Sequence, residues 1–402
     1  MSRRRTRPIT ALLLALGLLV PPVLAQVTPS QQEARRALYG EKLNSLTFRH
    51  MDEIFDTVPV SSGQRVWRLP EQIQALDILY RVDGQQRTTA DFLERTRTNA
   101  LLVIRDGRIV HEIYRNKSGP ESRFISFSIA KSIISVLIGQ AIADGLIGGV
   151  DDPVTRYVPE LAGGAYEGVT IRQALLMRSG VGFRETYGFG QKSQMEELYE
   201  NSLVTGRQRF TDLALSIERA HPPGDFFNYS TLETGVLGWV LERAVKQPLA
   251  DYMAERLWQP AGMEAPGYWL MDGPPGVGRA WAGAGFNARL RDYGRLGLMM
   301  LNNGRANGRQ VVPASWVAAS TLPQGTEPAA ADRVQGYQYQ WWTLPDSDAY
   351  MAKGVHGQFI WIDPASQTVI VKLSHWPTAW VKPLEDETLA FFKAVVARPE
   401  WR

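Results

Sequence analysis

The 402-residue sequence contains no cysteine. This absence excludes disulfide bonds, thiolate metal sites, a cysteine nucleophile and lipid attachment at a cysteine near a signal peptide. Histidine is scarce and no HExxH motif is present, which argues against a zinc site. The five histidines are His50, His111, His221, His356 and His375.

The sequence also lacks disordered composition, low-complexity blocks and repeats of solenoid period. Hydrophobic residues make up 44% and charged residues 21% of the chain, as in a globular enzyme with a sizeable core. The length allows two domains, or one large domain with an insertion. We therefore expect a globular protein.

The N-terminus has the pattern of a secretion signal, and its apolar run, residues 10–20, is too short to span a bilayer comfortably. A basic segment precedes this run, and small residues end at Ala25, where a signal peptidase would cleave. An uncleaved anchor and a twin-arginine signal are the alternatives. The sequence predicts a signal peptide over residues 1–25 and, after its cleavage, a periplasmic or secreted protein without a stable membrane span.

Excess positive charge is absent from the mature chain. The signal holds four arginines and no acidic residue, so its removal changes the formal charge from +3 to −1. The main electrostatic argument for a nucleic-acid partner disappears with it. The expected partner is a small-molecule substrate, and the sequence does not define the oligomeric state.

The clearest local structure is a hairpin. Two apolar, β-branched runs, 100–104 and 109–114, are joined through Asp106-Gly107, a strong signal for a tight turn. Residues 126–143 follow as a helix that is apolar on most faces and therefore buried. Asp144-Gly145 is expected to end it.

Later segments set the expected fold class. Strands near both ends of the chain with helices between them predict an α/β fold of the α+β type. In this fold, N- and C-terminal segments form one mixed antiparallel sheet that is flanked by helices. A mostly helical region is inserted between these segments. A cleft at the junction is the place to look for chemistry. We expect helices at 234–246, 249–257, 290–302 and about 382–397, strands at 337–342, 357–362 and 368–373, a leader with short helices over 26–97, and a domain over 98–402 with its insertion at about 150–335.

Ser128 and Lys131 have the spacing of a nucleophile and its base. A hydroxyl needs a base within hydrogen-bond reach, and positions i and i+3 share one face of a helix. Burial among apolar residues lowers the pKa of a lysine, and a neutral amine can accept the proton. A serine at a helix start also offers its own amide to an oxyanion. Chance supplies this spacing in roughly every second protein of such composition, so a merely buried, paired lysine remains the alternative.

Two further segments carry candidate partners. Tyr229 follows a Pro-Gly loop at a loop–helix junction, where a phenol beside a lysine could shuttle protons, although a core tyrosine is the alternative. His356, Gly357 and Gln358 lie just before or within a late strand, where an edge N–H can complete an oxyanion hole. His356 could contact a substrate carboxylate or amide, and a structural histidine is the alternative.

In order and approximate spacing, these three elements resemble the serine β-lactamase/penicillin-binding superfamily. The better match is to the branch of class C β-lactamases, family VIII esterases and 6-aminohexanoate-dimer (nylon-oligomer) hydrolases. The resemblance spans about 95–395 of the chain. Further stretches that carry it are 151–153, 157–161, 175–180, 234–242, 292–297 and 336–342.

The resemblance implies a role for each candidate. Ser128 would be the acylated nucleophile, Lys131 its partner base, and Tyr229 the group that assists proton transfer to the leaving group. The N–H of Ser128 and an N–H at about Gln358 would form the oxyanion hole, flanked by His356 and Gly357. No metal or organic cofactor is implied.

Two departures from the superfamily bear on the substrate. The Tyr-x-Asn of β-lactamases reads Tyr229-Ser230-Thr231, and their Lys-Thr-Gly reads Val355-His356-Gly357. The second change removes the lysine that helps to hold the carboxylate of β-lactams and D-alanyl peptides. We therefore expect an amidase or esterase of small linear substrates, with 6-aminohexanoate dimers as the nearest analogy. A β-lactamase or DD-carboxypeptidase, and a non-catalytic penicillin-binding-type module, are the alternatives.

Overall fold

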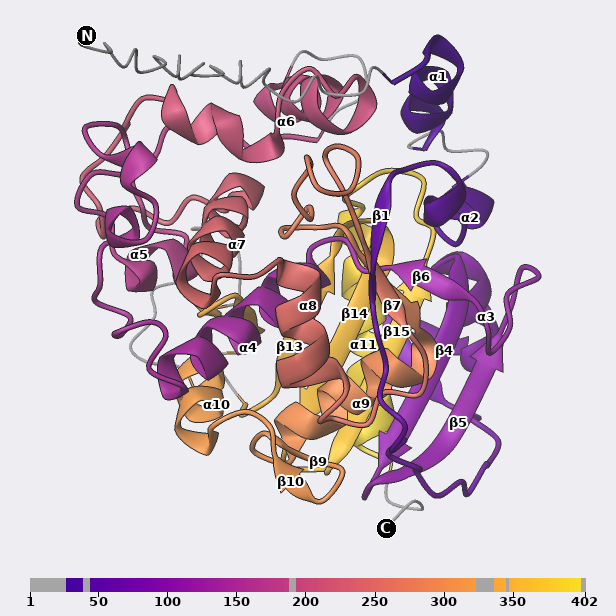
Figure 1. Cartoon of the computed structure of the whole chain (residues 1–402). Helices are drawn as coiled ribbons and strands as arrows, with labels where there is room; N and C mark the ends of the chain where they lie inside the picture. Colours follow the sequence, from indigo (N-terminus) through magenta and orange to yellow (C-terminus); the bar gives the residue numbers. More distant parts are fainter. Residues whose placement is uncertain (1–26, 39–43, 188–192, 323–335, 345–346, 399–402) are drawn as a thin grey trace, which may run out of the picture.

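A seven-stranded antiparallel sheet forms the centre of the molecule (Figure 1). It joins a hairpin from the first third of the chain to five strands that follow residue 335, which confirms the expected fold class. The computed structural model describes residues 27–38, 44–187, 193–322, 336–344 and 347–398, so the predicted signal peptide lies outside the described residues. In spatial order the strands are β11 (Gly336–Gln338), β12 (Trp341–Thr343), β13 (Tyr350–Gly354), β14 (Gln358–Asp363), β15 (Thr368–Ser374), β4 (Thr98–Arg105) and β5 (Arg108–Tyr114).

The β4–β5 hairpin forms as predicted. Asp106 and Gly107 have φ angles of 50° and 74°, as in the two-residue turn whose twist matches that of paired strands. All residues of β4 are buried, and β15 pairs with its other edge. A strand covered on both faces reads as a continuous apolar run, and this is the pattern of residues 100–104.

Helices cover both faces of this sheet. The described α-helices are α1 (Pro29–Ala37), α2 (Asn44–Thr47), α3 (Thr89–Arg95), α4 (Ile129–Ala143), α5 (Ile171–Leu175), α6 (Gln194–Tyr199), α7 (Thr231–Val245), α8 (Leu249–Met253), α9 (Leu290–Leu301), α10 (Ala314–Thr321) and α11 (Lys382–Val396). Within these described ranges, none of the helices combines the length and the apolar character needed to cross a bilayer.

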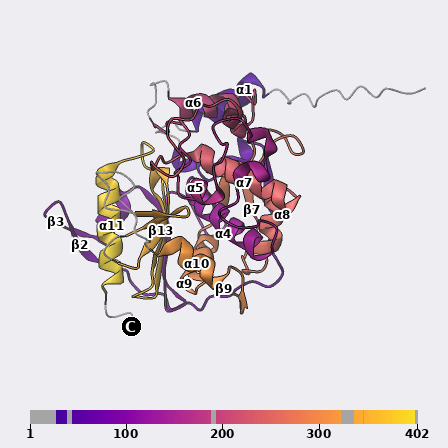
Figure 2. The ribbon, with the colours of Figure 1, turned by 90° about the vertical axis from the view of Figure 1, so that its left-hand side faces the viewer.

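The two helical layers cover opposite faces of the sheet, and only one of them carries the candidate site. Figure 2 shows α11 on one face of the sheet, next to the hairpin of β2 (Leu79–Val82) and β3 (Gln85–Thr88), and α4, α9 and α10 on the other face. On the α11 face, Phe392 packs against the rings of Phe359 and Trp361. The opposite layer carries α4 and α7, whose N-terminal ends meet beside the sheet, and these ends hold the candidate site.

Helix α9 packs directly against the sheet through two glycines that face the strands. A β-carbon on Gly294 would lie 2.5 Å from a methyl carbon of Leu102, and one on Gly297 would lie 2.6 Å from a methyl carbon of Val369. Any larger residue would push the helix off the strands. This contact explains both glycines of the 292–297 stretch in packing terms.

A second, four-stranded sheet was not expected from the sequence. It joins strands from the leader, from the segment before α4 and from the inserted region, so the inserted region is not helical throughout. Its strands, in spatial order, are β1 (Thr57–Val60), β7 (Gly267–Leu270), β8 (Phe286–Arg289) and β6 (Arg123–Ile125). A small hairpin, β9 (Arg305–Ala306) with β10 (Arg309–Gln310), follows α9.

Two predicted boundaries are wrong. The helix expected from residue 126 begins at Ile129, because Phe127 takes a φ of 44°, outside the helical region. The strand expected over 337–342 is the β11–β12 hairpin, because Tyr339 and Gln340 both have positive φ and reverse the chain. Strand β13 was missed altogether, whereas the final helix forms over almost the whole expected range.

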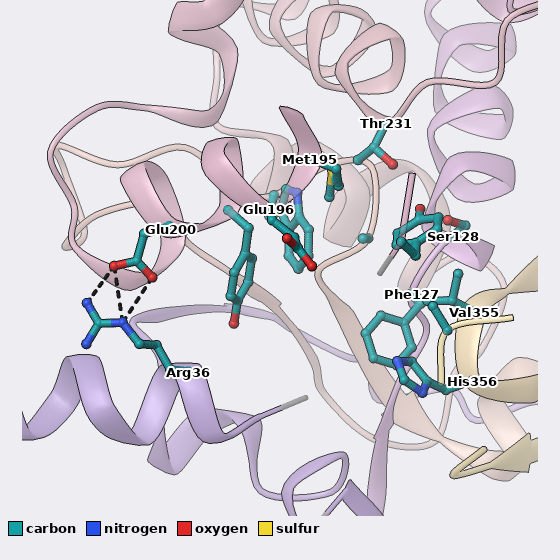
Figure 3. A pocket seen from close by; sticks show the side chains of 14 residues that line it. Arg36, Phe127, Ser128, Met195, Glu196, Glu200, Thr231, Val355 and His356 are labelled. Atoms are coloured by element: carbon teal, nitrogen blue, oxygen red, sulfur yellow. Dashed lines mark hydrogen bonds and ion pairs between the residues drawn. The ribbon is translucent and has the colours of Figure 1, made fainter. Parts of the chain in front are cut away.

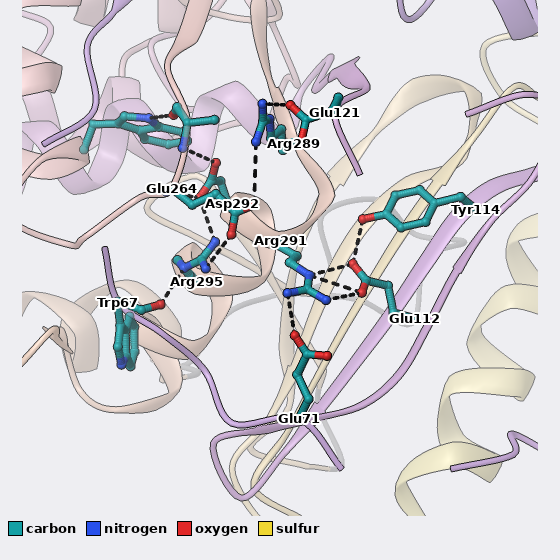
Figure 4. Close-up of polar contacts among 12 residues, drawn as sticks. Trp67, Glu71, Glu112, Tyr114, Glu121, Glu264, Arg289, Arg291, Asp292 and Arg295 are labelled. Atoms are coloured by element: carbon teal, nitrogen blue, oxygen red, sulfur yellow. Dashed lines mark hydrogen bonds and ion pairs between the residues drawn. The ribbon is translucent and has the colours of Figure 1, made fainter. Parts of the chain in front are cut away.

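A buried ionic network ties the leader to α9 (Figure 4). Arg295 donates to the carbonyl of Trp67 at 2.9 Å and to the Glu264 carboxylate at 2.7 Å. It also lies 3.0 Å from the fully buried Asp292, which accepts from the backbone N–H of Glu264 at 2.8 Å. The polar residues of the 292–297 stretch therefore hold the leader and the second sheet in place.

Candidate active site

The second sheet positions the start of helix α4. Strand β6 pairs with β8, and the N–H of Ser126 continues this pairing by donating to the Phe286 carbonyl at 2.7 Å. The chain then turns through Phe127 and enters the helix at Ser128, which occupies the N-cap position. The Ser128 side chain makes no capping hydrogen bond, in contrast to most serines at helix starts. Its hydroxyl is directed to Lys131 instead.

Lys131 lies at the centre of a three-way hydrogen-bond arrangement. Its Nζ lies 2.9 Å from Ser128 Oγ, 2.9 Å from Thr231 Oγ1 and 2.9 Å from the carbonyl oxygen of Gly283. The side chain is fully buried, and desolvation lowers its pKa to about 8, partly offset by the negative charge of Glu185. A lysine in this state can accept a proton from Ser128 near neutral pH.

Close backbone approach makes this arrangement possible. Gly283 lies in the turn between β7 and β8, and a β-carbon on it would lie 2.5 Å from the Thr231 methyl carbon. Thr231 is the first residue of α7, which Ser230 caps through the N–H of Glu233. Three separate elements therefore bring their polar atoms to a single buried amine.

Tyr229 lies where the sequence placed it, immediately before α7. The centre of its ring is 5.0 Å from Lys131 Nζ, and the ring packs against Tyr337 and Trp342, with centroid separations of 5.9 and 5.6 Å. The neighbouring Asn228 fixes the loop by donating to the Phe183 carbonyl at 2.7 Å. The structure thus brings Ser128, Lys131 and Tyr229 together.

The turn between β13 and β14 lies against Ser128. A β-carbon on Gly354 would lie 3.1 Å from the Ser128 backbone nitrogen and 2.5 Å from the Ser126 carbonyl oxygen. Val355, the next residue, lines the pocket described below. The end of β13 therefore brings its backbone to the N–H of Ser128.

His356, Gly357 and Gln358 form the turn itself. The His356 ring is buried, donates from Nδ1 to the Trp376 carbonyl at 2.8 Å and has its pKa lowered to about 4 by desolvation, so it is neutral at neutral pH. Gly357, at φ 85°, leaves no room for a β-carbon beside the Trp376 ring. The Gln358 side chain donates to the carbonyls of His356 and Ser374, both at 3.0 Å. Gln358 does not line the pocket, whereas His356 does.

A pocket of about 250 Å³ opens onto Ser128 (Figure 3). Its walls are mainly aromatic and aliphatic, with charged groups on one side. Glu196, on α6, points its carboxylate into the open centre, and Glu200 is held by an ion pair with Arg36 of α1. The lining residues are Arg36, Phe127, Ser128, Tyr187, Met195, Glu196, Tyr199, Glu200, Thr231, Trp281, Ala284, Val355, His356 and Ala379.

Lys353 is the nearest candidate for the missing lysine of Lys-Thr-Gly, and it is engaged elsewhere. Its Nζ lies 2.8 Å from the Glu385 carboxylate in a buried ion pair. The same ammonium lies over the rings of Trp342 and Trp380, at 4.0 and 4.6 Å. It does not line the pocket, so it offers no cation to a bound carboxylate there.

Several residues of this site carry no sequence signal. The sequence marked Thr231 only as the residue that stands in place of the asparagine of Tyr-x-Asn. The contacts of Thr231 and Gly283 with Lys131, the effect of the Glu185 charge on Lys131, and the place of Val355 in the pocket lining were not predicted. Arg36 comes from the leader, for which no role was predicted from the sequence. Each of them reaches the site through tertiary contacts that a local pattern does not encode.

A buried Ser–Lys pair with a neighbouring tyrosine, on an antiparallel sheet between helical layers, defines a serine hydrolase of the β-lactamase/transpeptidase-like class. The family model described as Beta-lactamase matches residues 86–392, and the chain belongs to this family. The 6-aminohexanoate-dimer hydrolase of Paenarthrobacter ureafaciens is 31% identical over 349 residues, which cover 83% of this chain and 86% of that protein.

Two further similarities fall in the same group. Esterase EstB of Burkholderia gladioli is 32% identical over 188 residues, covering 42% of this chain and 46% of that protein. A solved structure described as a candidate 6-aminohexanoate-dimer hydrolase from Bacillus anthracis superposes with a TM-score of 0.82 at 24% identity, covering 92% of this chain and 98% of that one. The chain is thus a serine hydrolase with amidase and esterase relatives.

Proposed function

We propose that this protein is an exported hydrolase that cleaves amide or ester bonds of small linear substrates through an acyl-enzyme on Ser128. The observation that carries the proposal is the environment of Lys131, a fully buried amine with a lowered pKa and 2.9 Å from Ser128 Oγ. Export follows from the predicted signal peptide over residues 1–25, and the mature chain would begin at Gln26.

Acylation uses the three residues that meet at the start of α4 and α7. Ser128 Oγ attacks the carbonyl carbon of the substrate while its proton moves to Lys131 Nζ. The tetrahedral intermediate collapses, its bond to the leaving nitrogen or oxygen breaks, and the leaving group takes the proton with the help of Tyr229. Water then attacks the carbonyl carbon of the acyl-enzyme while its proton moves to Lys131 Nζ. Ser128 Oγ takes this proton back as the bond to the acyl group breaks, which releases the acid and restores Ser128.

The oxyanion hole is formed by the N–H groups of Ser128 and Val355. The amide of Ser128 lies at the N-terminal end of α4, where the helix dipole favours negative charge. Support for Val355 comes from the close passage of Gly354 past the Ser128 nitrogen and from the place of Val355 in the pocket lining. This assignment moves the second donor three positions from Gln358, whose side chain braces the same turn.

The pocket favours a flexible chain that ends in a cationic amine. Aromatic and aliphatic walls suit methylene groups, and the Glu196 carboxylate suits an ammonium group. With Lys353 paired to Glu385, the pocket offers less to the carboxylate of a β-lactam. Linear amides of ω-amino acids, the class to which 6-aminohexanoate dimers belong, combine both features.

Substitution of the nucleophile tests the proposal. Ser128→Ala is expected to abolish turnover of p-nitrophenyl esters and of linear ω-amino amides while leaving the thermal midpoint close to that of the wild type. Turnover of these esters at the wild-type rate by Ser128→Ala would overturn the mechanism. Rapid turnover of a fluorescent penicillin would instead favour the β-lactamase or DD-carboxypeptidase alternative.

A further inference from the structure

A chain of hydrogen bonds continues from Lys131 away from Ser128. Thr231 Oγ1 accepts from Lys131 Nζ at 2.9 Å and donates its own proton to Oε1 of Glu185 at 2.8 Å. The other oxygen of the same carboxylate accepts the backbone N–H of Thr231. Glu185 lies in the loop after Val181 and is half-buried. Nothing in its local sequence marks it as part of a site.

The hydrogen-bond donors and acceptors around Lys131 Nζ determine what the contact between Thr231 and Glu185 does. A threonine hydroxyl has one proton, so a hydroxyl that donates to Glu185 can offer only lone pairs to Lys131. The Gly283 carbonyl is also purely an acceptor. A neutral lysine amine has two protons and one lone pair, and two of its three neighbours therefore take the protons. The remaining lone pair points to the third neighbour, Ser128 Oγ, which lies 2.9 Å away.

We propose that Glu185 is a positioning residue that, through Thr231, aims the lone pair of Lys131 at the Ser128 hydroxyl. Without the carboxylate, the Thr231 hydroxyl is free to rotate and donate to Lys131, and it then competes with Ser128 for the only lone pair. Because this role presupposes Ser128 as nucleophile and Lys131 as base, it rests on the proposed function.

Glu185 also acts on Lys131 by its charge. Desolvation lowers the pKa of Lys131 to about 8, and the nearby carboxylate opposes this change. Among the described residues, the titratable groups that face Lys131 are Glu185, across Thr231, and Tyr229, whose ring centre lies 5.0 Å away. Tyr187 contacts the Glu185 carboxylate from the exposed side. Removal of the Glu185 charge is therefore expected to lower the pKa of Lys131 further.

A simpler role for Glu185 is that of a cap. Its contact with the Thr231 N–H satisfies a free donor in the first turn of α7, and such caps stabilise helices. If Glu185 were only a cap, Glu185→Gln would lower the free energy of unfolding but leave kcat on the pH plateau unchanged, while the loss of its charge would still move the acid limb. The two roles therefore separate by experiment.

The sharpest variant is Glu185→Gln. The amide replaces one of the two accepting oxygens with an NH₂ donor, so the present arrangement, in which one oxygen accepts the N–H of Thr231 and the other its hydroxyl, cannot persist. We expect kcat for an ester substrate to fall about 10-fold to 100-fold, a share of the effect of a general base, with KM almost unchanged. The acid limb of kcat/KM should move to lower pH. Glu218→Gln, an exposed glutamate in the facing segment, is the matched control and should leave both parameters unchanged.

A double-mutant cycle shows whether Glu185 acts through Thr231. Thr231→Val removes the bridging hydroxyl and should lower kcat, and Thr231→Ser should restore most of that loss. In the Thr231→Val background, Glu185→Gln should have almost no further effect on kcat. Independent, multiplying losses would overturn the proposal, and so would a wild-type kcat on the pH plateau for Glu185→Gln.

The thermal midpoint and the rate of fluorophosphonate labelling separate a loss of stability from a loss of activity in Glu185→Gln. If Glu185→Gln melts well below the wild type, the same cycle is measured at a temperature where all variants are folded, with the rate of fluorophosphonate labelling in place of kcat. Equal labelling rates for wild type and Glu185→Gln would then overturn the proposal. Wild-type turnover by Ser128→Ala would remove the proposed function itself, whereas an inactive Ser128→Ala with an unaltered Glu185→Gln removes only the role of Glu185.

Discussion

A β-carbon on Gly354 would lie 3.1 Å from the backbone nitrogen of Ser128, so strand β13 ends in direct contact with the first turn of α4. The sheet and the helical layer meet at this point. The absence of a side chain at Gly354 lets the two N–H groups proposed to bind the oxyanion approach each other. The seven-stranded sheet thereby fixes one half of the site, and the second sheet fixes the other.

Gly354→Ala should reduce activity strongly. The added methyl group would lie 2.5 Å from the Ser126 carbonyl oxygen, a backbone atom that can give way only if β13 shifts. We expect kcat to fall about 100-fold, comparable to the loss of one oxyanion-hole donor. The control is Gly149→Ala, whose methyl group would meet open space. Wild-type kcat in Gly354→Ala would contradict the proposed oxyanion hole.

The pH dependence of kcat/KM should follow Lys131. Below its pKa the amine is protonated and cannot accept the Ser128 proton, so activity should rise with pH and level off above about 8. The His356 ring, with a pKa of about 4, is neutral throughout this range. The measurement uses a non-ionising ester from pH 5 to pH 10. A flat profile, or a midpoint near the ordinary pKa of a lysine, would argue against Lys131 as the base.

Glu196 should discriminate between substrates. Glu196→Gln removes the carboxylate that faces the pocket, and we expect kcat/KM for a linear ω-amino amide to fall about 10-fold, or about 1.4 kcal/mol. A neutral p-nitrophenyl ester lacks the ammonium group and should be almost unaffected. Glu197→Gln, an exposed neighbour on α6, serves as the control. A loss of equal size on both substrates would contradict a specific amine contact.

The recognisable part of the site is the part that a single segment encodes. Ser128 and Lys131 share one helix, and Asp106-Gly107 specifies its hairpin locally, so both could be read directly from the sequence. Tyr229 stood out because a Pro-Gly loop and a helix start surround it. The antiparallel sheet followed from strand-like runs near both ends of the chain.

The rest of the site depends on contacts between distant segments. Thr231 and Gly283 lie 100 and 152 residues from Lys131 in sequence. The polar atoms of Thr231 and Gly283 become partners of Lys131 only after the second sheet and α7 have packed. No periodicity or spacing in the sequence predicts such contacts. Positive φ at Phe127, which moves the helix start, is likewise set by the packing around it and not by the phenylalanine itself.

The ionic network around Arg295 should dominate the stability of the leader. Arg295→Ala leaves the buried Asp292 carboxylate without its cation and releases the carbonyl of Trp67. We expect the free energy of unfolding to fall by about 3–5 kcal/mol, as when one partner of a buried pair is removed. Urea unfolding measures this change, with Arg309→Ala, an exposed residue of β10, as the control. A loss below about 1 kcal/mol would show that the network contributes little.

The most direct measurement of the central claim is the site of covalent modification. The purified protein is treated with a fluorophosphonate, digested and analysed by mass spectrometry, with Ser128→Ala treated in parallel. The proposed mechanism predicts one adduct, on the peptide that contains Ser128, and no labelling of the variant. An adduct on another residue, or equal labelling of Ser128→Ala, would contradict it.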